Sequence, residues 1–203
     1  MKSGEWKKTV RAALRDLPGG ADLWGFSRSL CYRTDRTWTA TGVLAEASGV
    51  GLGEYLWVVR MPLFVPADVI DLSFSTRLDT VDDEEIRRGP SADSIRAALR
   101  AVPSESEALE HIADAADARN VRSLEAAAYA TVILGRGDGT AVGLLDQVCD
   151  TVPEYPWVEE VVDRADGIRS LLTGGAATTA LERLLSWTHK TATALRVTLP
   201  NHR

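Results

Sequence analysis

The sequence predicts an α+β fold, in which an N-terminal helix packs on a four-stranded antiparallel sheet and an all-α helical array follows. Two observations lead to this prediction. Apolar residues alternate at every second position up to about Leu78, which is the period of a strand, and recur every three or four positions beyond it, which is the period of a helix. Nine of the thirteen aromatic residues lie within residues 1–80, and sheets favour large flat side chains.

Charge changes at the same boundary. Residues 1–80 hold 10 Lys/Arg and 9 Asp/Glu, a net charge of +1, whereas residues 81–203 hold 13 Lys/Arg and 20 Asp/Glu, a net charge of −7. We therefore expect an α+β sheet unit in residues 1–80 and a helical unit in residues 81–203 that packs against the sheet. An acidic surface repels phosphate backbones, so nucleic acid is not expected as a partner.

The composition is that of a globular protein with a core of ordinary size. The chain has 203 residues, of which 45% are hydrophobic and 26% are charged. Its two cysteines, Cys31 and Cys149, have neither redox nor zinc spacing, which is typical of a reducing compartment. No run approaches the ~20 apolar residues that span a bilayer, and none resembles a signal peptide. We expect a cytoplasmic protein without membrane contact, bound metal or cofactor.

The sheet unit is expected to begin with a helix and to continue with four strands. Trp6, Val10 and Leu14 recur at helical spacing, and Ser3 can cap the helix that they define. The segment 55–61 is apolar on both faces, which indicates a central strand covered on both sides. The strands are expected at residues 24–32, 38–44, 55–61 and 69–75.

Helical signals dominate from residue 90 onward. Ser104 and Glu107 have the spacing of a capping box, in which one pair of side chains satisfies two free backbone amides. Short connections, such as the one at Gly135, favour antiparallel packing of neighbouring helices. The helices are expected to start after Pro90 and at Ser104, to cover residues 121–134 and 139–150, and to start again after Pro156 and after Gly175.

Part of the helical unit resembles a tetratricopeptide repeat over about thirty residues. In that family, small and aromatic residues of one helix nest against a second helix across a tight turn. The repeat tryptophan and a second copy of the motif are missing here. The resemblance therefore implies a helical hairpin and not a peptide-binding solenoid. The matching residues are Leu124, Ala128, Tyr129, Leu134, Gly135, Arg136, Asp138, Ala141, Leu144 and Leu145.

The sheet unit is similar to uncharacterised bacterial proteins of unknown function. In those proteins a strand ends in a Pro-Leu-aromatic-Val-Pro stretch, and an Arg-Leu pair follows. The corresponding residues here are Pro62 to Pro66 and Arg77-Leu78. The similarity implies a bacterial origin and no particular activity.

Arg60 is the first candidate binding residue. It lies at the end of the most apolar strand, where an arginine needs a carboxylate or a ligand anion. Glu54, Asp68 or Asp71 could supply an internal ion pair, which is the favoured interpretation, and anion binding is the alternative. Arg77 has a similar but weaker claim.

Tyr155 and Trp157 form the second candidate. They lie between or next to prolines in a half of the chain that has few other aromatic residues. Two large aromatic side chains in such a segment could form an exposed contact patch for a partner. They could equally plug the seam between the two units, and this plug is the favoured interpretation because apolar loop residues usually cover a core.

Residues with catalytic or metal-binding chemistry do not form a recognisable motif. His111, His189 and His202 have no partner at metal spacing, and we interpret His111 and His189 as solvent-facing helix residues. Cys31 lies on a strand in a half of the chain that contains no histidine, which favours a packed thiol over a nucleophile. No catalytic residue and no metal ligand are therefore assigned.

These observations favour an interaction protein over an enzyme. We expect a bacterial cytoplasmic module that binds another protein, for example an immunity or defence partner. Its acidic half would steer it towards a basic partner, such as a nucleic-acid-cleaving toxin, and a homo-oligomer is also compatible with the sequence. The alternative is an enzyme or binder of small anionic molecules that uses the concave face of the sheet, lined by Trp24, Trp38, Trp57 and Arg60.

Overall fold

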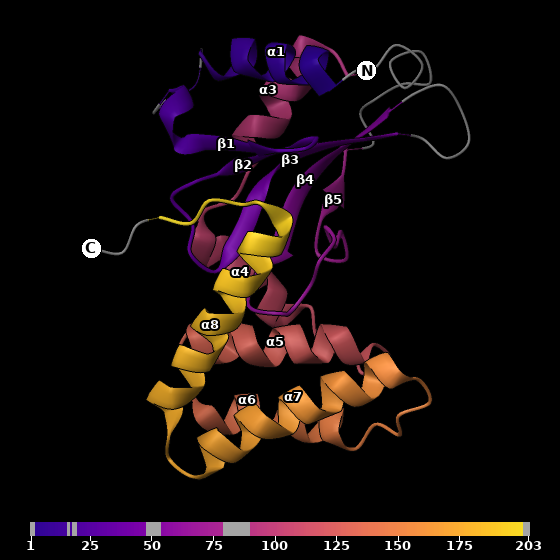
Figure 1. Cartoon of the computed structure of the whole chain (residues 1–203), viewed down its shortest axis with the longest axis vertical. Helices are drawn as coiled ribbons and strands as arrows, with labels where there is room; N and C mark the ends of the chain where they lie inside the picture. The colour runs from indigo at the N-terminus through magenta and orange to yellow at the C-terminus, as the bar shows by residue number, and fades with distance from the viewer. Residues whose placement is uncertain (1–2, 16, 18–19, 48–53, 79–89, 201–203) are drawn as a thin grey trace.

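The computed structural model describes residues 3–15, 17, 20–47, 54–78 and 90–200. The side chain of Ser3, expected to cap the first helix, and the expected boundary near residue 80 lie outside the described residues. The fold is α+β, as the sequence predicts: a helix, an antiparallel sheet and then a series of helices. Figure 1 shows the sheet in the upper half of the molecule and most of the later helices below it.

The sheet has five strands in the order β1-β2-β3-β4-β5, and every neighbouring pair is antiparallel. The longest pairing joins β3 and β4, from Thr39 opposite Pro62 to Ala47 opposite Glu54. The apolar segment 55–61 is thus central, as its sequence indicates, with β3 on one side and β5 on the other. The strands are β1 (Trp24–Ser27), β2 (Leu30–Arg33), β3 (Thr39–Ala47), β4 (Glu54–Pro62) and β5 (Thr76–Arg77).

Two differences from the expected sheet have local causes. Residues 24–32 form two strands and not one, because the chain reverses at Arg28, which takes a left-handed backbone conformation with φ of 53°. Residues 69–75 form no strand, because the carboxylate of Asp71 accepts hydrogen bonds from the backbone N–H and the hydroxyl of Ser73 and closes a turn. The edge strand is therefore only the two-residue β5.

Helices α1 (Ser3–Leu14) and α3 (Ala92–Arg100) cover one face of the sheet, as Figure 1 shows. Strands β2 and β3 approach closely at Gly42, where a Cβ atom would collide with the carbonyl oxygen of Cys31. The shared core contains Trp6, Val10, Ala13, Leu14, Cys31, Val43, Leu56, Val58, Ile95, Ala98 and Leu99.

The opposite face of the sheet is covered by the end of α8 (Ala177–Leu195), by the residues that follow it and by the segment after β4. Two hydrogen bonds fix this layer: the Ser27 hydroxyl donates to the Leu195 carbonyl at 2.5 Å, and the Thr198 N–H donates to the Tyr32 hydroxyl at 2.8 Å. The buried residues here are Leu30, Tyr32, Ala40, Leu44, Val59, Met61, Leu63, Ala192, Leu195 and Val197.

The remaining helices form a second core below the sheet. They are α4 (Glu105–Asp114), α5 (Val121–Ile133), α6 (Asp138–Cys149), α7 (Pro156–Thr173) and the first half of α8. The capping box expected at the start of α4 is present, since the Ser104 hydroxyl accepts from the Glu107 N–H and the Glu107 carboxylate accepts from the Ser104 N–H. Helix α5 is almost entirely buried between its neighbours.

A charged cluster lies inside this helical core. Glu125 on α5 is 0% exposed, and its two carboxylate oxygens accept hydrogen bonds from Nε and Nη2 of Arg164 on α7, at 2.9 and 3.1 Å. The Tyr129 hydroxyl donates to the same carboxylate at 3.1 Å. Burial raises the pKa of Glu125, and the hydrogen bonds from Arg164 oppose that rise. The cluster therefore sets the alignment of α5 against α7.

We expect Arg164→Ala to lower the free energy of unfolding by ~3–5 kcal/mol, because it leaves the Glu125 carboxylate buried without its cation and with only the Tyr129 hydroxyl as a partner. The loss should shrink as the pH falls through the raised pKa of Glu125, above the ordinary glutamate value of about 4.3, because protonated Glu125 carries no charge. Urea denaturation at several pH values measures both effects. Arg169→Ala on the same helix removes only exposed ion pairs and should cost little; an equal loss in both variants would contradict the expectation.

Candidate functional site

The sheet and the helical core meet along a seam that polar contacts hold together. The carboxylate of Glu105, in the first turn of α4, accepts hydrogen bonds from the backbone N–H groups of Trp38 and Thr39, at 2.5 and 3.2 Å. On the other side, the Thr191 hydroxyl of α8 donates to the Val65 carbonyl at 3.4 Å. These contacts tie α4 to the start of β3, and α8 to the segment after β4.

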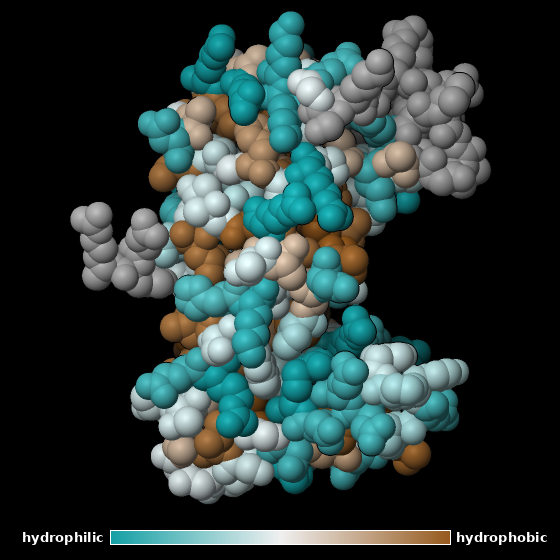
Figure 2. Space-filling view, viewed as in Figure 1, coloured by the Kyte–Doolittle hydropathy of each residue, from teal (hydrophilic) through white to brown (hydrophobic). Residues whose placement is uncertain are grey.

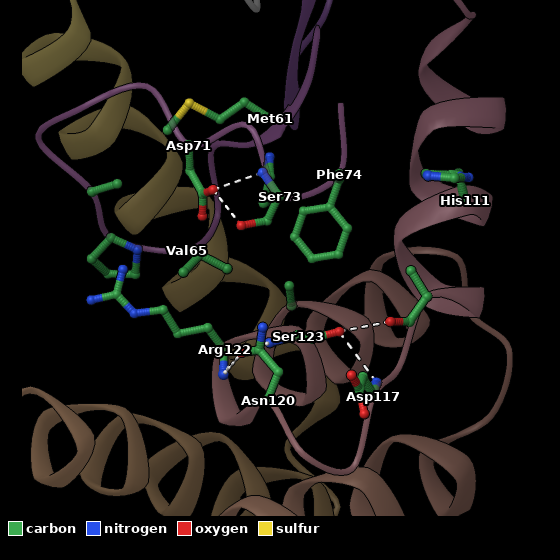
Figure 3. A pocket seen from close by; sticks show the side chains of 15 residues that line it. Met61, Val65, Asp71, Ser73, Phe74, His111, Asp117, Asn120, Arg122 and Ser123 are labelled. Atoms are coloured by element: carbon green, nitrogen blue, oxygen red, sulfur yellow. Dashed lines mark hydrogen bonds between the residues drawn. The ribbon is translucent and has the colours of Figure 1, made fainter. Parts of the chain in front are cut away.

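A cavity of about 240 Å³, the seam cavity, opens between the end of β4, the turn at residues 65–74 and helices α4 and α5. Apolar and polar side chains are interleaved around the cavity, as Figure 3 shows. Met61, Pro62, Val65, Pro66, Ala67, Phe74, Ala115 and Ala126 form the apolar part of the lining, and Asp71, Ser73, His111, Asp117, Asn120, Arg122 and Ser123 form the polar part.

Several of these polar groups already serve the fold. The side-chain oxygen Oδ1 of Asn120 caps α5 by accepting from the N–H groups of Arg122 and Ser123, at 3.1 and 3.2 Å. The Ser123 hydroxyl donates to the Ala115 carbonyl at 2.6 Å and accepts from the Asp117 N–H. The N-terminal amides of α5 are therefore partly satisfied by the chain itself, and a ligand must rely on other groups.

Asp71 and Arg122 are the charged groups left for a ligand. One oxygen of Asp71 accepts from Ser73, but within the described chain neither Asp71 nor Arg122 forms an ion pair. Figure 3 shows both on the same side of the cavity, with Val65 beside them. The guanidinium of Arg122 also lies 4.9 Å from the ring centre of Trp157. Asp71 and Arg122 thus line the same cavity as several apolar side chains and form no ion pair with each other.

A second, more open hollow, the Arg60 hollow, lies between β4, the end of α3 and α4. It is lined by Arg60, Arg100, Ala101, Val102, Pro103, Glu107 and His111. Nη1 of Arg60 donates to the Thr76 hydroxyl at 2.8 Å. No ion pair joins Arg60 to Glu54, Asp68 or Asp71 in the described residues, so the favoured interpretation of an internal ion pair is wrong. Burial lowers the pKa of Arg60.

His111 lies between the two hollows and lines both of them. Its side chain is exposed, in agreement with the sequence interpretation, but its position at the seam was not expected. Burial and the charge of Arg60 lower the pKa of His111, while Asp114 opposes the shift. A helical pattern in the sequence could have indicated part of this site, because Glu107 and His111 are four residues apart and share one face of α4.

Arg77 does not join either hollow. It lies exposed on the short edge strand β5, and its guanidinium lies 5.0 Å from the ring centre of Tyr55. This cation–π contact gives Arg77 a structural partner across the strand pair. A binding role for Arg77 remains a prediction.

Tyr155 and Trp157 stand at the surface and do not plug the seam, so the favoured interpretation of these two residues is wrong. Tyr155 is 58% exposed and Trp157 is 42% exposed, and Val152, which is 78% exposed, precedes them in the same connection. We call these three residues the aromatic patch. Tyr155 and Pro156 open α7, and Arg122 supports the Trp157 ring. A segment of this kind at the surface is available to a partner.

The expected pocket on the concave face of the sheet does not form. Both faces of the sheet are covered by helices, and no described hollow is shared by the three tryptophans and Arg60. Trp57 donates its indole N–H to Glu46 at 2.9 Å, and Trp24 stacks under Arg33. Trp38 packs against the helical core. Sequence alone could not show which sheet positions become covered, because the covering helices α1, α3 and α8 come from three separate parts of the chain.

The described residues contain no group of three histidine, cysteine or acidic side chains that could hold a metal ion. In the same part of the chain, every helix is too short or too polar to cross a membrane. Comparison of the sequence with protein-family models and with curated proteins, and of the fold with solved structures, finds no match.

The cysteines provide a test of the packing at β2. Burial raises the pKa of Cys31 to about 12, as expected for a packed thiol and not for a nucleophile. Cys31 is fully buried and Cys149 is half-buried, so a thiol reagent should modify Cys149 first and reach Cys31 only after unfolding. Mass spectrometry of native and urea-treated protein measures this order. Rapid labelling of Cys31 in the native state would contradict it.

Proposed function

We propose that this chain is a bacterial cytoplasmic interaction module that binds another protein through the aromatic patch. The observation that supports this most is the exposure of Tyr155 and Trp157 beside Val152. Binding energy in protein interfaces concentrates in a few residues, and tyrosine and tryptophan are enriched among them. Large aromatic side chains at the surface of an otherwise aromatic-poor helical unit are therefore the strongest candidate for a contact point.

The patch is held in one arrangement before any partner arrives. Pro156 is in the first turn of α7 and fixes the direction of the chain there. The Arg122 guanidinium lies against the Trp157 ring and restricts its motion. A side chain that is already ordered loses less entropy on binding, so more of its contact energy contributes to affinity.

The charges around the patch favour a partner with a basic surface. Exposed carboxylates precede the patch and follow it along α7: Asp150, Glu154, Glu159, Glu160 and Asp163. Figure 2 shows hydrophilic side chains over most of this end of the molecule. A rim of one charge speeds association with a surface of the opposite charge. A basic toxin that cleaves nucleic acid is the class of partner that fits, with this chain as its immunity or defence counterpart.

The test is co-purification of the tagged chain with its partner from the native host, followed by affinity measurement. Trp157→Ala should weaken binding by at least ~2 kcal/mol, about thirtyfold, as for a central interface residue. Val69→Ala, which changes an exposed apolar residue outside the patch, should leave the affinity unchanged. Association should slow as salt is raised. Equal affinity of both variants would contradict the proposal, and a dimer of this chain abolished by Trp157→Ala would assign the patch to self-association.

A second candidate function is binding of a small molecule in the seam cavity. The supporting observation is that the cavity is lined both by apolar side chains and by two charged ones, Asp71 and Arg122. Neither of these has an ion-pair partner in the described chain. Such a cavity suits a small amphipathic molecule whose apolar body packs on Phe74. The candidate small-molecule site is therefore the seam cavity and not the concave face of the sheet that the sequence suggested.

A thermal-shift screen over metabolites tests this second candidate. A ligand at 100 times its Kd should stabilise the protein by ~2.7 kcal/mol, or roughly 5–10 °C in Tm. Asp71→Asn keeps an oxygen to accept from Ser73, and so preserves the turn, but removes the charge and should reduce the shift. Asp68→Asn, in the same segment but outside the cavity lining, is the control. No shift, or equal shifts in both variants, would count against the cavity as a site.

A further inference from the structure

Arg60 is a partly buried cation without an acidic partner among the described residues. Its side chain comes from the central strand β4, and burial lowers its pKa. The Thr76 hydroxyl accepts one hydrogen bond from Nη1, and no other acceptor for the five N–H donors of the guanidinium occurs among the described residues. None of these donors is buried without a partner, so they are open to solvent and an anion from solution can accept hydrogen bonds from them.

Two further groups from other elements line the same hollow. Arg100 comes from the last turn of α3, and His111 comes from α4. No ion pair of Arg100 occurs in the described chain. Glu107 is the one carboxylate of the lining, and it accepts hydrogen bonds from the N–H and hydroxyl of Ser104, at 2.8 and 2.7 Å. Three elements thus direct basic side chains towards one hollow of a protein whose net charge is −6.

The pKa of His111 depends on the charges that line this hollow. Arg60, Arg100 and Glu107 surround it on this side, Asp114 lies one turn further along its own helix, and the seam cavity places Asp71, Asp117 and Arg122 on its other side. Burial and Arg60 together lower its pKa, so His111 is neutral near pH 7. An anion between Arg60 and His111 would cancel the repulsion from Arg60 and favour protonation of the imidazole.

We propose that the Arg60 hollow binds a phosphate group, free or as part of a phosphomonoester. The guanidinium groups of Arg60 and Arg100 donate hydrogen bonds to its oxygens, as planar guanidinium donors do for tetrahedral oxyanions. His111 takes up one proton as the anion binds and then donates it in a further hydrogen bond. This site is separate from the aromatic patch and does not rest on the proposed protein partner.

NMR titration of the histidine imidazoles tests the proposal directly. The chain has three histidines, and His111→Gln assigns the signal of His111. Saturating sulfate, whose charge is constant over this pH range, should raise the pKa of His111 by about one unit. At fixed pH it should not displace the NMR signal of His189. Affinity for sulfate should accordingly be about tenfold higher near pH 5.5 than near pH 8, because the protonated imidazole binds the anion better.

Substitutions of Arg60 and Arg100 distinguish an anion-binding role of these residues from a purely structural role. Arg60→Gln and Arg100→Gln should each weaken sulfate binding about tenfold or more, whereas Arg96→Gln on the same helix as Arg100 should not change it. Because Arg100 is exposed, its variant remains folded even if Arg60→Gln does not. Comparison of inorganic phosphate with a nucleoside monophosphate and a sugar phosphate then identifies the source of the phosphate group.

Two results would overturn the proposal. One is a pKa of His111 that does not move at saturating sulfate. The other is equal sulfate affinity of wild type, Arg60→Gln and Arg100→Gln, which would make the arginines structural. Sulfate binding that persists in Trp157→Ala, while partner binding is lost, would show that the two sites act independently.

Discussion

Helix α8 is the constraint on which the rest of the structure depends, because it belongs to both cores. Its first half places Ala180 and Leu184 in the helical core, and its last turns place Ala192 and Leu195 on the sheet. A helix of 19 residues spans ~28 Å, which is enough to cross the seam. Packed cores do not deform continuously, so the sheet and the helices hold one relative arrangement, and the hollows between them keep their shape.

The polar side chains of the seam divide into those that build it and those that remain available. Glu105 accepts hydrogen bonds from backbone N–H groups of the sheet and so holds α4 against it, and Asn120 caps the start of α5 in the same way. Asp71, Arg122 and Arg60 carry charge without an ion-pair partner in the described chain. Asp71 also closes the turn at Ser73, and Arg122 is exposed and lies against Trp157, so the ligand roles that we propose for these residues rest on the hollows that they line.

Arg122 connects two of the three surfaces that we propose as binding sites, the aromatic patch and the seam cavity. Its guanidinium lies against Trp157 of the aromatic patch, and its side chain lines the seam cavity. A cation held between an aromatic face and a cavity mouth can respond to occupancy on either side. The exposed carboxylates near Trp157 contribute to the net charge of −7 of residues 81–203, and this acidic surface is what supports the proposal of a basic partner.

The sequence by itself determined the local structure: the α+β class, the capped start of α4 at Ser104 and the apolar central strand. These features follow from periodicity and capping, which act over a few residues. Only the tertiary structure decided that Trp157 is exposed, that Arg60 faces Arg100 and His111, and that no tryptophan pocket forms on the sheet. Each of these features depends on contacts between elements that are far apart in the chain. The pattern of apolar residues shows which face of a helix or strand is buried, but not which other element packs against that face.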